Sequence, residues 1–290
     1  MKMNRAIFFN QVRSSVFGGR LSTKQVDGMN RIIDYWEDRY PQIDADRFSY
    51  ILSTVKGETG NMQPIKEKGG RRYFTRMYDI KGKRPYKARE LGNIHPGDGA
   101  KFPGMGLIQN TGRRNARRAS ELIHEVLGKS VDFESQPKLL MEWEYALPLM
   151  FEGFIRGVWT GKKLDDYFND GDGDDDLINA RRIVNGRDKA RAFAAWAKSF
   201  RSAIEAAMEA EPVDVIEAEA APEPVTSKKP AKSTTIWAQI MQWAATGGTA
   251  AMTAIGNLDW KMVLAAGGIL SVAAGLWIIR ERLMKMDDGV

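Results

Sequence analysis

The stretch Phe48-Ser-Tyr-Ile-Leu-Ser-Thr-Val-Lys-Gly-Glu58-Thr-Gly-Asn-Met-Gln-Pro-Ile-Lys-Glu67 decides the fold, because it joins an apolar helix face to two carboxylates. Asp44 or Asp46 is the expected N-cap of this helix. Glu58 continues the apolar register, so the helix carries a carboxylate on its buried side. That register is the spacing i, i+3, i+4, i+7, which is typical of a buried helix face and is formed by Phe48, Ile51, Leu52 and Val55.

The two carboxylates have different predicted environments. Burial and the negative end of a helix dipole both disfavour the anion of Glu58, which favours a general acid. Glu67 lies between Lys66 and Lys68, whose positive charge favours the ionised form, as a general base requires. The spacing of nine residues, with a turn at Pro64, leaves room for a substrate bond between them.

Composition limits the chemistry further. The 290 residues contain no Cys and only two His, His95 and His124, so we expect no disulfide, no thiolate chemistry, no metal site and no cofactor. The net charge of +6 is a mild basic excess, which suits an anionic partner surface without implying nucleic acid. The N-terminus has no sustained apolar run, so we expect no cleavable signal peptide.

Helical periodicity dominates residues 1–210. Ser22 and Gln25 have the form of a capping box that opens a helix ended by Pro41. Residues 61–104 lack periodicity and suit long loops around a cleft, with a short hairpin. A helix is expected from Thr111 to Leu127 with the arginines between 113 and 118 mostly outward, and another from Pro137 with a kink at Pro148.

The end of this region adds two more helices. Residues 170–176 resemble a calcium loop, but Asp175 and Arg181 stand where such a loop needs Gly and Glu, so a solvated acidic turn is the favoured interpretation. We expect Asp176 to cap a helix that stops at Asn185-Gly186, and Asp188 to cap the next helix. A globular domain of residues 1–210 results.

Beyond residue 210 the composition changes twice. Residues 211–233 are rich in Pro, Ala and charge and are expected to form a disordered linker. Residues 234–258 carry no charge but include Gln and Thr, which suits an interfacial helix or the first arm of a membrane hairpin. Residues 259–290 contain the uncharged run Met262 to Ile279, long enough for a transmembrane helix with a basic tail. A buried helix of a small second domain is the alternative.

The flanks of this run bear on topology and assembly. Lysines before residue 233 and basic residues after Ile279 fit the positive-inside rule best if both apolar runs cross the membrane. A single span would place one basic cluster outside. Gly267, Ser271 and Gly275 form a small-residue ridge, which would allow two helices to pair in a homo-oligomer.

Three motifs in order give a resemblance to glycoside hydrolase family 19, the chitinase-like lysozymes common among phage endolysins, over residues 20–205. They are Glu58-Thr59 with Met-Gln-Pro-Ile-Lys-Glu67, then Gly104-Met-Gly-Leu-Ile-Gln109-Asn-Thr111, then Ala180-Arg-Arg-Ile-Val-Asn185-Gly186. The resemblance implies a mainly α, two-lobed, lysozyme-like fold with a sugar-binding cleft. It also implies inverting hydrolysis with Glu58 as general acid and Glu67 as general base.

The resemblance assigns further residues. Thr111 would hold the attacking water, and Gln109 and Asn185 would contact substrate. Three positions depart from the family pattern: Gly57 stands where His is usual, Ala116 where an aromatic is usual, and Asn110 where an apolar residue is usual.

Plainer interpretations stand beside these roles. Glu67 would pair with its lysine neighbours, Thr111 would be an N-cap, and Gln109 and Asn185 would satisfy backbone groups at turns. Tyr73 and Tyr78 would stack on sugar rings or pack on the core.

Taken together, the sequence predicts a peptidoglycan hydrolase, a muramidase-type glycosidase that cleaves β-1,4 bonds. Its predicted location is the bacterial inner membrane, from which it would act on the periplasmic cell wall. Chitin is the alternative substrate. The alternative class is a non-catalytic, wall-binding or holin-like membrane protein.

Overall fold

A computed structural model describes residues 2–169 and 176–210. All of them belong to the first of two units into which the chain divides, Met1–Ala221 and Pro222–Val290. The predicted linker, interfacial helix and transmembrane helix lie outside the described residues, as does most of the acidic turn. Within the described ranges, no helix has both the length and the apolar character that a bilayer crossing needs.

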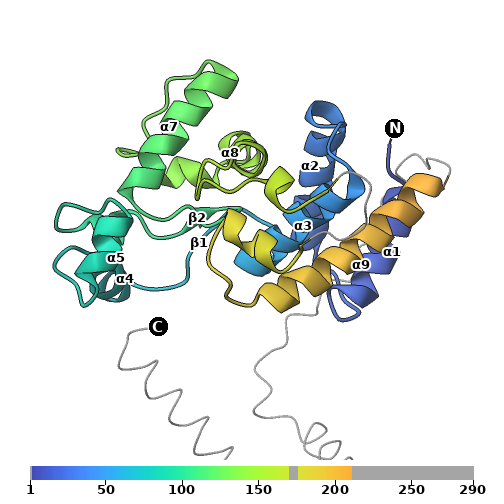
Figure 1. The fold of residues 1–290 in the computed structure, drawn as a ribbon, viewed down its shortest axis with the longest axis horizontal. Helices are drawn as coiled ribbons and strands as arrows, with labels where there is room; N and C mark the ends of the chain where they lie inside the picture. The colour runs from blue at the N-terminus through green and yellow to red at the C-terminus, as the bar shows by residue number, and fades with distance from the viewer. Residues whose placement is uncertain (1, 170–175, 211–290) are drawn as a thin grey trace, which may run out of the picture. The chain divides into compact units, whose positions relative to one another are not determined.

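The described unit is mainly helical, which confirms the mainly α part of the predicted fold class (Figure 1). One small sheet joins β1 (Ile65–Lys66) to β2 (Met105–Gly106) in antiparallel register. Because residues 67–104 lie between the two strands, this sheet is not the short hairpin expected within residues 61–104. Single turns of 3-10 helix occur at Pro137–Met141, Leu164–Asp166 and Asn179–Ile183. The α-helices are α1 (Arg5–Ser15), α2 (Thr23–Arg39), α3 (Ala45–Thr59), α4 (Arg71–Tyr78), α5 (Pro85–Glu90), α6 (Asp98–Lys101), α7 (Arg113–Leu127), α8 (Trp143–Arg156) and α9 (Ala190–Glu209).

Local sequence signals set the bounds of α2 and α3 as predicted. The side chain of Ser22 accepts a hydrogen bond from the Gln25 N–H, and the Gln25 side chain accepts one from the Ser22 N–H. Asp44 caps α3 by accepting from the Arg47 N–H at 2.8 Å. The predicted apolar face of α3, Phe48, Ile51, Leu52 and Val55, is fully buried.

The core around α3 is closed by the first and last helices of the unit. α9 packs against both α3 and α1, and Figure 1 shows α1 and α9 side by side. The rings of Phe8 and Phe200 stack with centroids 6.3 Å apart. The Asn4 N–H donates to the Ala207 carbonyl at 2.9 Å, so the two ends of the domain meet. The sequence did not predict α1.

Residues 66–101, which we call the small lobe, correct the prediction of long loops in this region. They form the short helices α4, α5 and α6, and α4 packs against the other two. Two buried carboxylates hold their connections: Asp79 accepts from the backbone N–H groups of Gly97 and Gly99, and Asp98 from those of Ile94 and His95. The Asp79 contacts span 18 and 20 residues and leave no periodic signal in the sequence.

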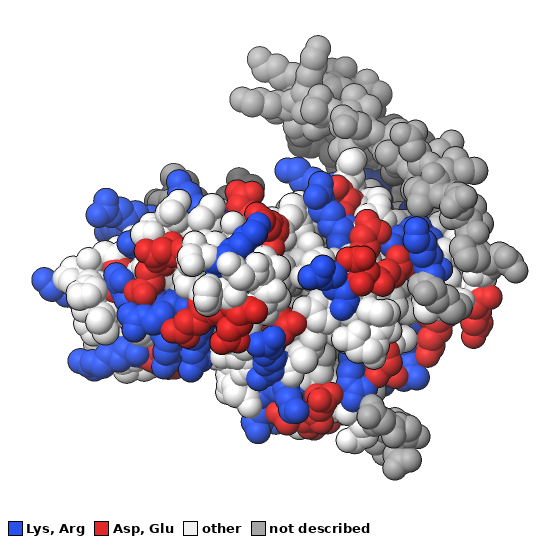
Figure 2. Space-filling view, turned by 90° about the horizontal axis from the view of Figure 1, so that it is seen from above, with Lys and Arg blue, Asp and Glu red and all other residues white. Residues whose placement is uncertain are grey.

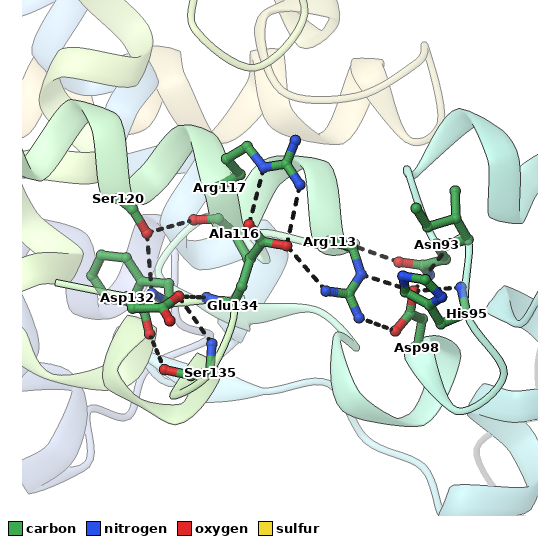
Figure 3. A network of polar contacts seen from close by, with 12 residues as sticks. Asn93, His95, Asp98, Arg113, Ala116, Arg117, Ser120, Asp132, Glu134 and Ser135 are labelled. Carbon is green, nitrogen blue, oxygen red and sulfur yellow. Dashed lines mark hydrogen bonds and ion pairs between the residues drawn. The ribbon is translucent and has the colours of Figure 1, made fainter.

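Arg113 corrects the prediction that the arginines of α7 point outward. Its guanidinium bonds Asp98 at 2.5 Å and Glu134 at 3.0 Å, while its backbone N–H donates to the Asn93 side chain (Figure 3). Burial alone would raise the pKa of Asp98, but the hydrogen bonds from Arg113 and the backbone hold that pKa below its usual value. The network ties the small lobe to α7.

Two helix starts also differ from the predictions. Pro137 opens a 3-10 turn, and α8 begins only at Trp143, with Pro148 buried inside it. Asp176 does accept from the Asn179 N–H at 2.9 Å, but the element that follows is the 3-10 turn Asn179–Ile183, whose N-cap position is Ile178. Asp188 does not cap α9, because the preceding residue is Lys189 in a left-handed conformation and no side chain bonds the helix end.

Candidate active site

A cleft of about 510 Å³ contains six of the seven candidate residues that the sequence singled out, with Tyr78 of α4 among them. Glu58 comes from the end of α3, Glu67 from just after β1, and the other three from loops near β2 and α9. Tyr73 is not among the lining residues. The lining residues are Glu58, Glu67, Tyr78, Lys87, Glu90, Leu91, Ile108, Gln109, Thr111, Arg114, Asn115, Trp159, Thr160, Val184, Asn185 and Gly186.

Glu58 is a largely buried carboxyl with one charged partner. Its side chain is 15% exposed, and its Oε1 atom accepts a hydrogen bond from Arg181 Nη2 at 2.5 Å. Burial raises the pKa of Glu58 above its usual value, and the guanidinium of Arg181 opposes this shift without cancelling it. The group is therefore biased towards holding a proton.

Arg181 is itself held by an aromatic ring. Its guanidinium carbon lies 4.2 Å from the ring centroid of Phe193, on α9. The Nη1 atom of Arg181 is buried and has no hydrogen-bond partner among the described residues. The ion pair with Glu58 is thus fixed from one side by packing, while one donor remains unused.

The same ring explains why the residue next to Glu58 is glycine. A Cβ atom built at Gly57 would lie 2.2 Å from the Cζ atom of Phe193. The space that a histidine side chain would occupy is filled by this phenylalanine. Gly57 therefore lets α9 bring Phe193 beneath Arg181.

Glu67 is held by neutral donors and not by the flanking lysines. Its Oε1 accepts from the Tyr78 hydroxyl at 2.9 Å and its Oε2 from the Gly104 N–H at 3.2 Å. Lys66 lies over the Phe74 ring, 5.3 Å from its centroid, and does not line the cleft. The flanking lysines, on which the prediction of Glu67 as a base was founded, therefore do not hold its carboxylate.

Thr111 and Gln109 lie beside the donor to Glu67. A Cβ at Gly104 would lie 2.8 Å from Gln109 Oε1 and 3.3 Å from Thr111 Oγ1. Thr111 donates to the Gln109 carbonyl at 2.9 Å, which leaves its hydroxyl oxygen able to accept. It does not cap α7, whose N-cap is Gly112. The Gln109 amide nitrogen donates to the carbonyls of Ile65 and Gly106 and so links the two strands β1 and β2.

Asn185 and Tyr73 differ in their access to the cleft. Asn185 is exposed at the rim, and its Oδ1 accepts from the Gly186 N–H at 2.8 Å, which leaves the amide nitrogen for a ligand. Tyr73 packs edge-on against Phe74 and Tyr78, with centroids 5.4 and 6.5 Å away. Tyr73 therefore supports Tyr78 from behind.

Two cations occupy the rim on the side of the small lobe. Lys87 pairs with the Glu90 carboxylate at 2.9 Å. Arg114 donates to the backbone carbonyl of Glu90, a neutral acceptor, and forms no ion pair within the described ranges. The cleft thus offers a positive charge, that of Arg114, which no carboxylate in the described ranges compensates.

Sequence reasoning missed several of these residues. Arg181 lies inside the third motif, but nothing in its spacing connects it with Glu58, 123 positions earlier. Tyr78 was predicted to stack on sugar rings or pack on the core, and Arg114 to lie on a solvated face or to meet an anionic wall or lipid. Neither residue was connected with the two acids. Trp159, which lines the cleft wall against Gly153, was not considered.

Comparisons with known proteins add a weak structural neighbour. No family model matches the chain, and no curated protein matches it. A crystal structure of a mutant of chitinase C resembles it with a TM-score of 0.42 and 15% sequence identity, covering 70% of this chain and 92% of that one. A likeness this distant carries no argument about function, so the proposal below rests on the cleft.

Proposed function

We propose that this chain is a glycoside hydrolase that cleaves the β-1,4-linked backbone of peptidoglycan with inversion. The observation that carries the proposal is the pair of carboxyls in one cleft with different partners. Glu58 is buried beside a single guanidinium and has a raised pKa, whereas Glu67 accepts two hydrogen bonds from neutral donors. Acid and base roles in glycoside hydrolysis need such a contrast.

In this mechanism Glu58 protonates the glycosidic oxygen. Because Arg181 bonds Oε1, the Oε2 atom is left to carry the proton, and the guanidinium then stabilises the carboxylate that remains. Glu67 takes a proton from a water molecule that attacks the anomeric carbon from the opposite face. Thr111 orients that water through its free acceptor, while Tyr78 and Gly104 fix the Glu67 carboxylate.

Peptidoglycan is favoured over chitin by the charge at the cleft rim. Chitin is a neutral polymer of N-acetylglucosamine, whereas peptidoglycan bears lactyl groups and stem peptides with carboxylates. Arg114 lines the cleft and has no carboxylate partner in the described part of the chain. It suits an anionic substituent that only peptidoglycan provides.

The proposal extends to location and assembly. The run Met262 to Ile279 would tether the enzyme to the bacterial inner membrane, with residues 211–233 as a linker, so that it acts on the periplasmic wall. Oligomerisation through the ridge of Gly267, Ser271 and Gly275 belongs to the same proposal.

Product analysis on purified peptidoglycan tests the proposal. Glu58→Gln and Glu67→Gln should each lower kcat about 10²- to 10⁴-fold, and Glu121→Gln, an exposed glutamate on α7, should leave it unchanged. Inversion of a β bond gives an α-anomer as the first product, which NMR detects. Binding to the wall with no cleavage of peptidoglycan or chitin by the wild type would favour the non-catalytic class.

The choice of polymer makes its own prediction. Arg114→Gln should lower kcat/KM on soluble peptidoglycan fragments about tenfold through loss of a charge-assisted hydrogen bond, and leave chitin oligosaccharides unaffected. Amidating the carboxylates of the fragments should remove the difference between the two enzymes. Arg89→Gln, an exposed arginine outside the cleft, is the matched control. An equal loss on both polymers would contradict this role.

A further inference from the structure

The small lobe carries more positive charge than the whole chain. Residues 66–101 contain eleven Lys and Arg against four Asp and Glu, a net charge of +7, whereas the chain carries +6. The other residues of the chain together therefore carry a net charge of −1. Figure 2 shows Lys and Arg side chains at its left end, the end at which Figure 1 places α4 and α5.

The acids of this lobe are largely withdrawn from its surface. Asp79 and Asp98 are buried, at 1% and 2% exposure, and bind backbone N–H groups. Glu67 is half-buried in the cleft, and Glu90 is paired with Lys87. The outward-facing charge of the small lobe is consequently almost all positive.

The basic side chains, by contrast, are exposed and uncompensated. None of the nine exposed ones forms an ion pair within the part of the chain that the structure describes. Four of them, Arg71, Arg72, Lys81 and Lys83, line one hollow beside Thr75 and Gly82. The nine are Lys66, Lys68, Arg71, Arg72, Lys81, Lys83, Arg84, Arg89 and Lys101.

A second observation comes from apolar exposure. The two large hydrophobic side chains that stand exposed in the described ranges are Tyr86, at 64%, and Ile94, at 59%, and both belong to the small lobe. Tyr86 lies between Arg84 and Lys87 in the sequence. An aqueous polyanion gains little from an exposed Ile, whereas a bilayer offers both anionic headgroups and an apolar phase. Tyr is a preferred side chain at that boundary.

We propose that the small lobe is a docking surface for an anionic phospholipid bilayer. Its exposed Lys and Arg side chains bind headgroup phosphates, and Tyr86 and Ile94 enter the headgroup boundary. This inference is independent of the hydrolase activity. It also agrees with the uncharged run Met262 to Ile279, which would keep a bilayer within reach.

The absence of cysteine permits a test on the full chain. A single cysteine at His95, next to Ile94, carries an environment-sensitive fluorophore, and a second protein carries it at Ser14, exposed on α1. Both are bound to vesicles of phosphatidylcholine alone or mixed with phosphatidylglycerol. We expect a blue shift at position 95 only with phosphatidylglycerol, reversed by 1 M salt, and no shift at position 14.

Two sets of substitutions separate the contributions. Arg71→Gln, Arg72→Gln, Lys81→Gln and Lys83→Gln together should abolish the shift. The charge-matched set Arg20→Gln, Lys24→Gln, Arg39→Gln and Lys198→Gln, exposed sites outside the small lobe, should retain it. Tyr86→Ser with Ile94→Ser should reduce the shift while leaving sedimentation with lipid-free cell walls unchanged.

Three results would overturn the proposal. They are an unshifted probe at position 95 on anionic vesicles, an equal shift on neutral vesicles, and a four-Gln variant that loses binding to cell walls but not the vesicle signal. Thermal unfolding of each variant shows whether the domain has stayed folded.

Discussion

Gly57 and Phe193 are two residues whose identities depend on each other. The ring of Phe193 occupies the space beside Gly57 and supports the guanidinium of Arg181, which bonds Glu58. The Glu58 carboxyl is therefore held from a distant helix, because its own helix provides no side chain for the purpose. A histidine at position 57 would require the Phe193 ring to move.

We expect Gly57→Ala to lower the free energy of unfolding by about 1–3 kcal/mol, because the new methyl group overlaps the Phe193 ring. Urea denaturation measures this loss. Adding Phe193→Leu should recover part of it by removing the ring. Gly186→Ala, where a Cβ would meet open space, is the control. A fully stable Gly57→Ala variant would mean that the ring is not confined as described.

The hydrogen bond from Arg181 to Glu58 leads us to expect a change in the pH dependence of activity when Arg181 is replaced. If Glu58 is the general acid, as proposed, it must be protonated to act, so activity should fall as pH rises through its pKa. Arg181 lowers this pKa, against the larger raising effect of burial. Arg181→Gln should therefore move the alkaline limb of the kcat profile to higher pH, besides lowering kcat. The neighbouring exposed Arg182 provides the control, since Arg182→Gln should leave the limb in place.

At the scale of elements, the sequence predicted best where local signals suffice. The capping box of α2, the Asp44 cap and the apolar face of α3 involve residues within one or two turns, and all are confirmed. The small lobe could not be predicted in this way. Its short helices are held by Asp79 and Asp98, which bind backbone groups up to twenty residues away.

The candidate site shows the same difference between local sequence signals and long-range contacts. Glu58, Glu67, Thr111, Gln109 and Asn185 were selected by motif, and the structure brings all five to one cleft, while their chemical roles remain proposals. The hydrogen-bond partners of the two acids could not be predicted from the sequence. The two acids contact Tyr78, Gly104 and Arg181 only because separate elements converge in the fold. The sequence instead indicated the lysines next to Glu67 as its partners.

The Asp98–Arg113 pair predicts how the small lobe responds to acid. Because the pKa of Asp98 is held below its usual value, its contribution to stability is complete above the unfolded pKa and lost as pH falls through the folded pKa. Asp98→Asn should cost about 3–5 kcal/mol at neutral pH by leaving Arg113 without its main partner. It should also flatten the acid side of the stability profile.

Urea titrations from pH 2.5 to 7 measure both effects. Asp34→Asn, at an ion pair whose carboxylate is 69% exposed, should change stability by less than about 1 kcal/mol. An acid profile that is unaltered by Asp98→Asn would contradict the role assigned to the network.

At the scale of the whole molecule, the described residues enclose a core that runs from Met3 to Ala207. We therefore expect residues 1–210 to unfold cooperatively by themselves, with a Tm within a few degrees of the same transition in the full chain. Deleting residues 1–16 should abolish the transition, since α1 covers α9. Calorimetry measures both, and a non-cooperative 1–210 fragment would show that the rest of the chain completes the core.

The bond from Asn4 to Ala207 has a consequence for how this domain can be rewired. With its first and last helices side by side, a short peptide can connect the natural ends, and new ends can be opened in an exposed turn such as the one after Gly128. A circular permutant of this kind would still bring α3, the two-stranded sheet and α9 around the same cleft. The geometry of the cleft therefore does not require the order in which these segments follow one another along the chain.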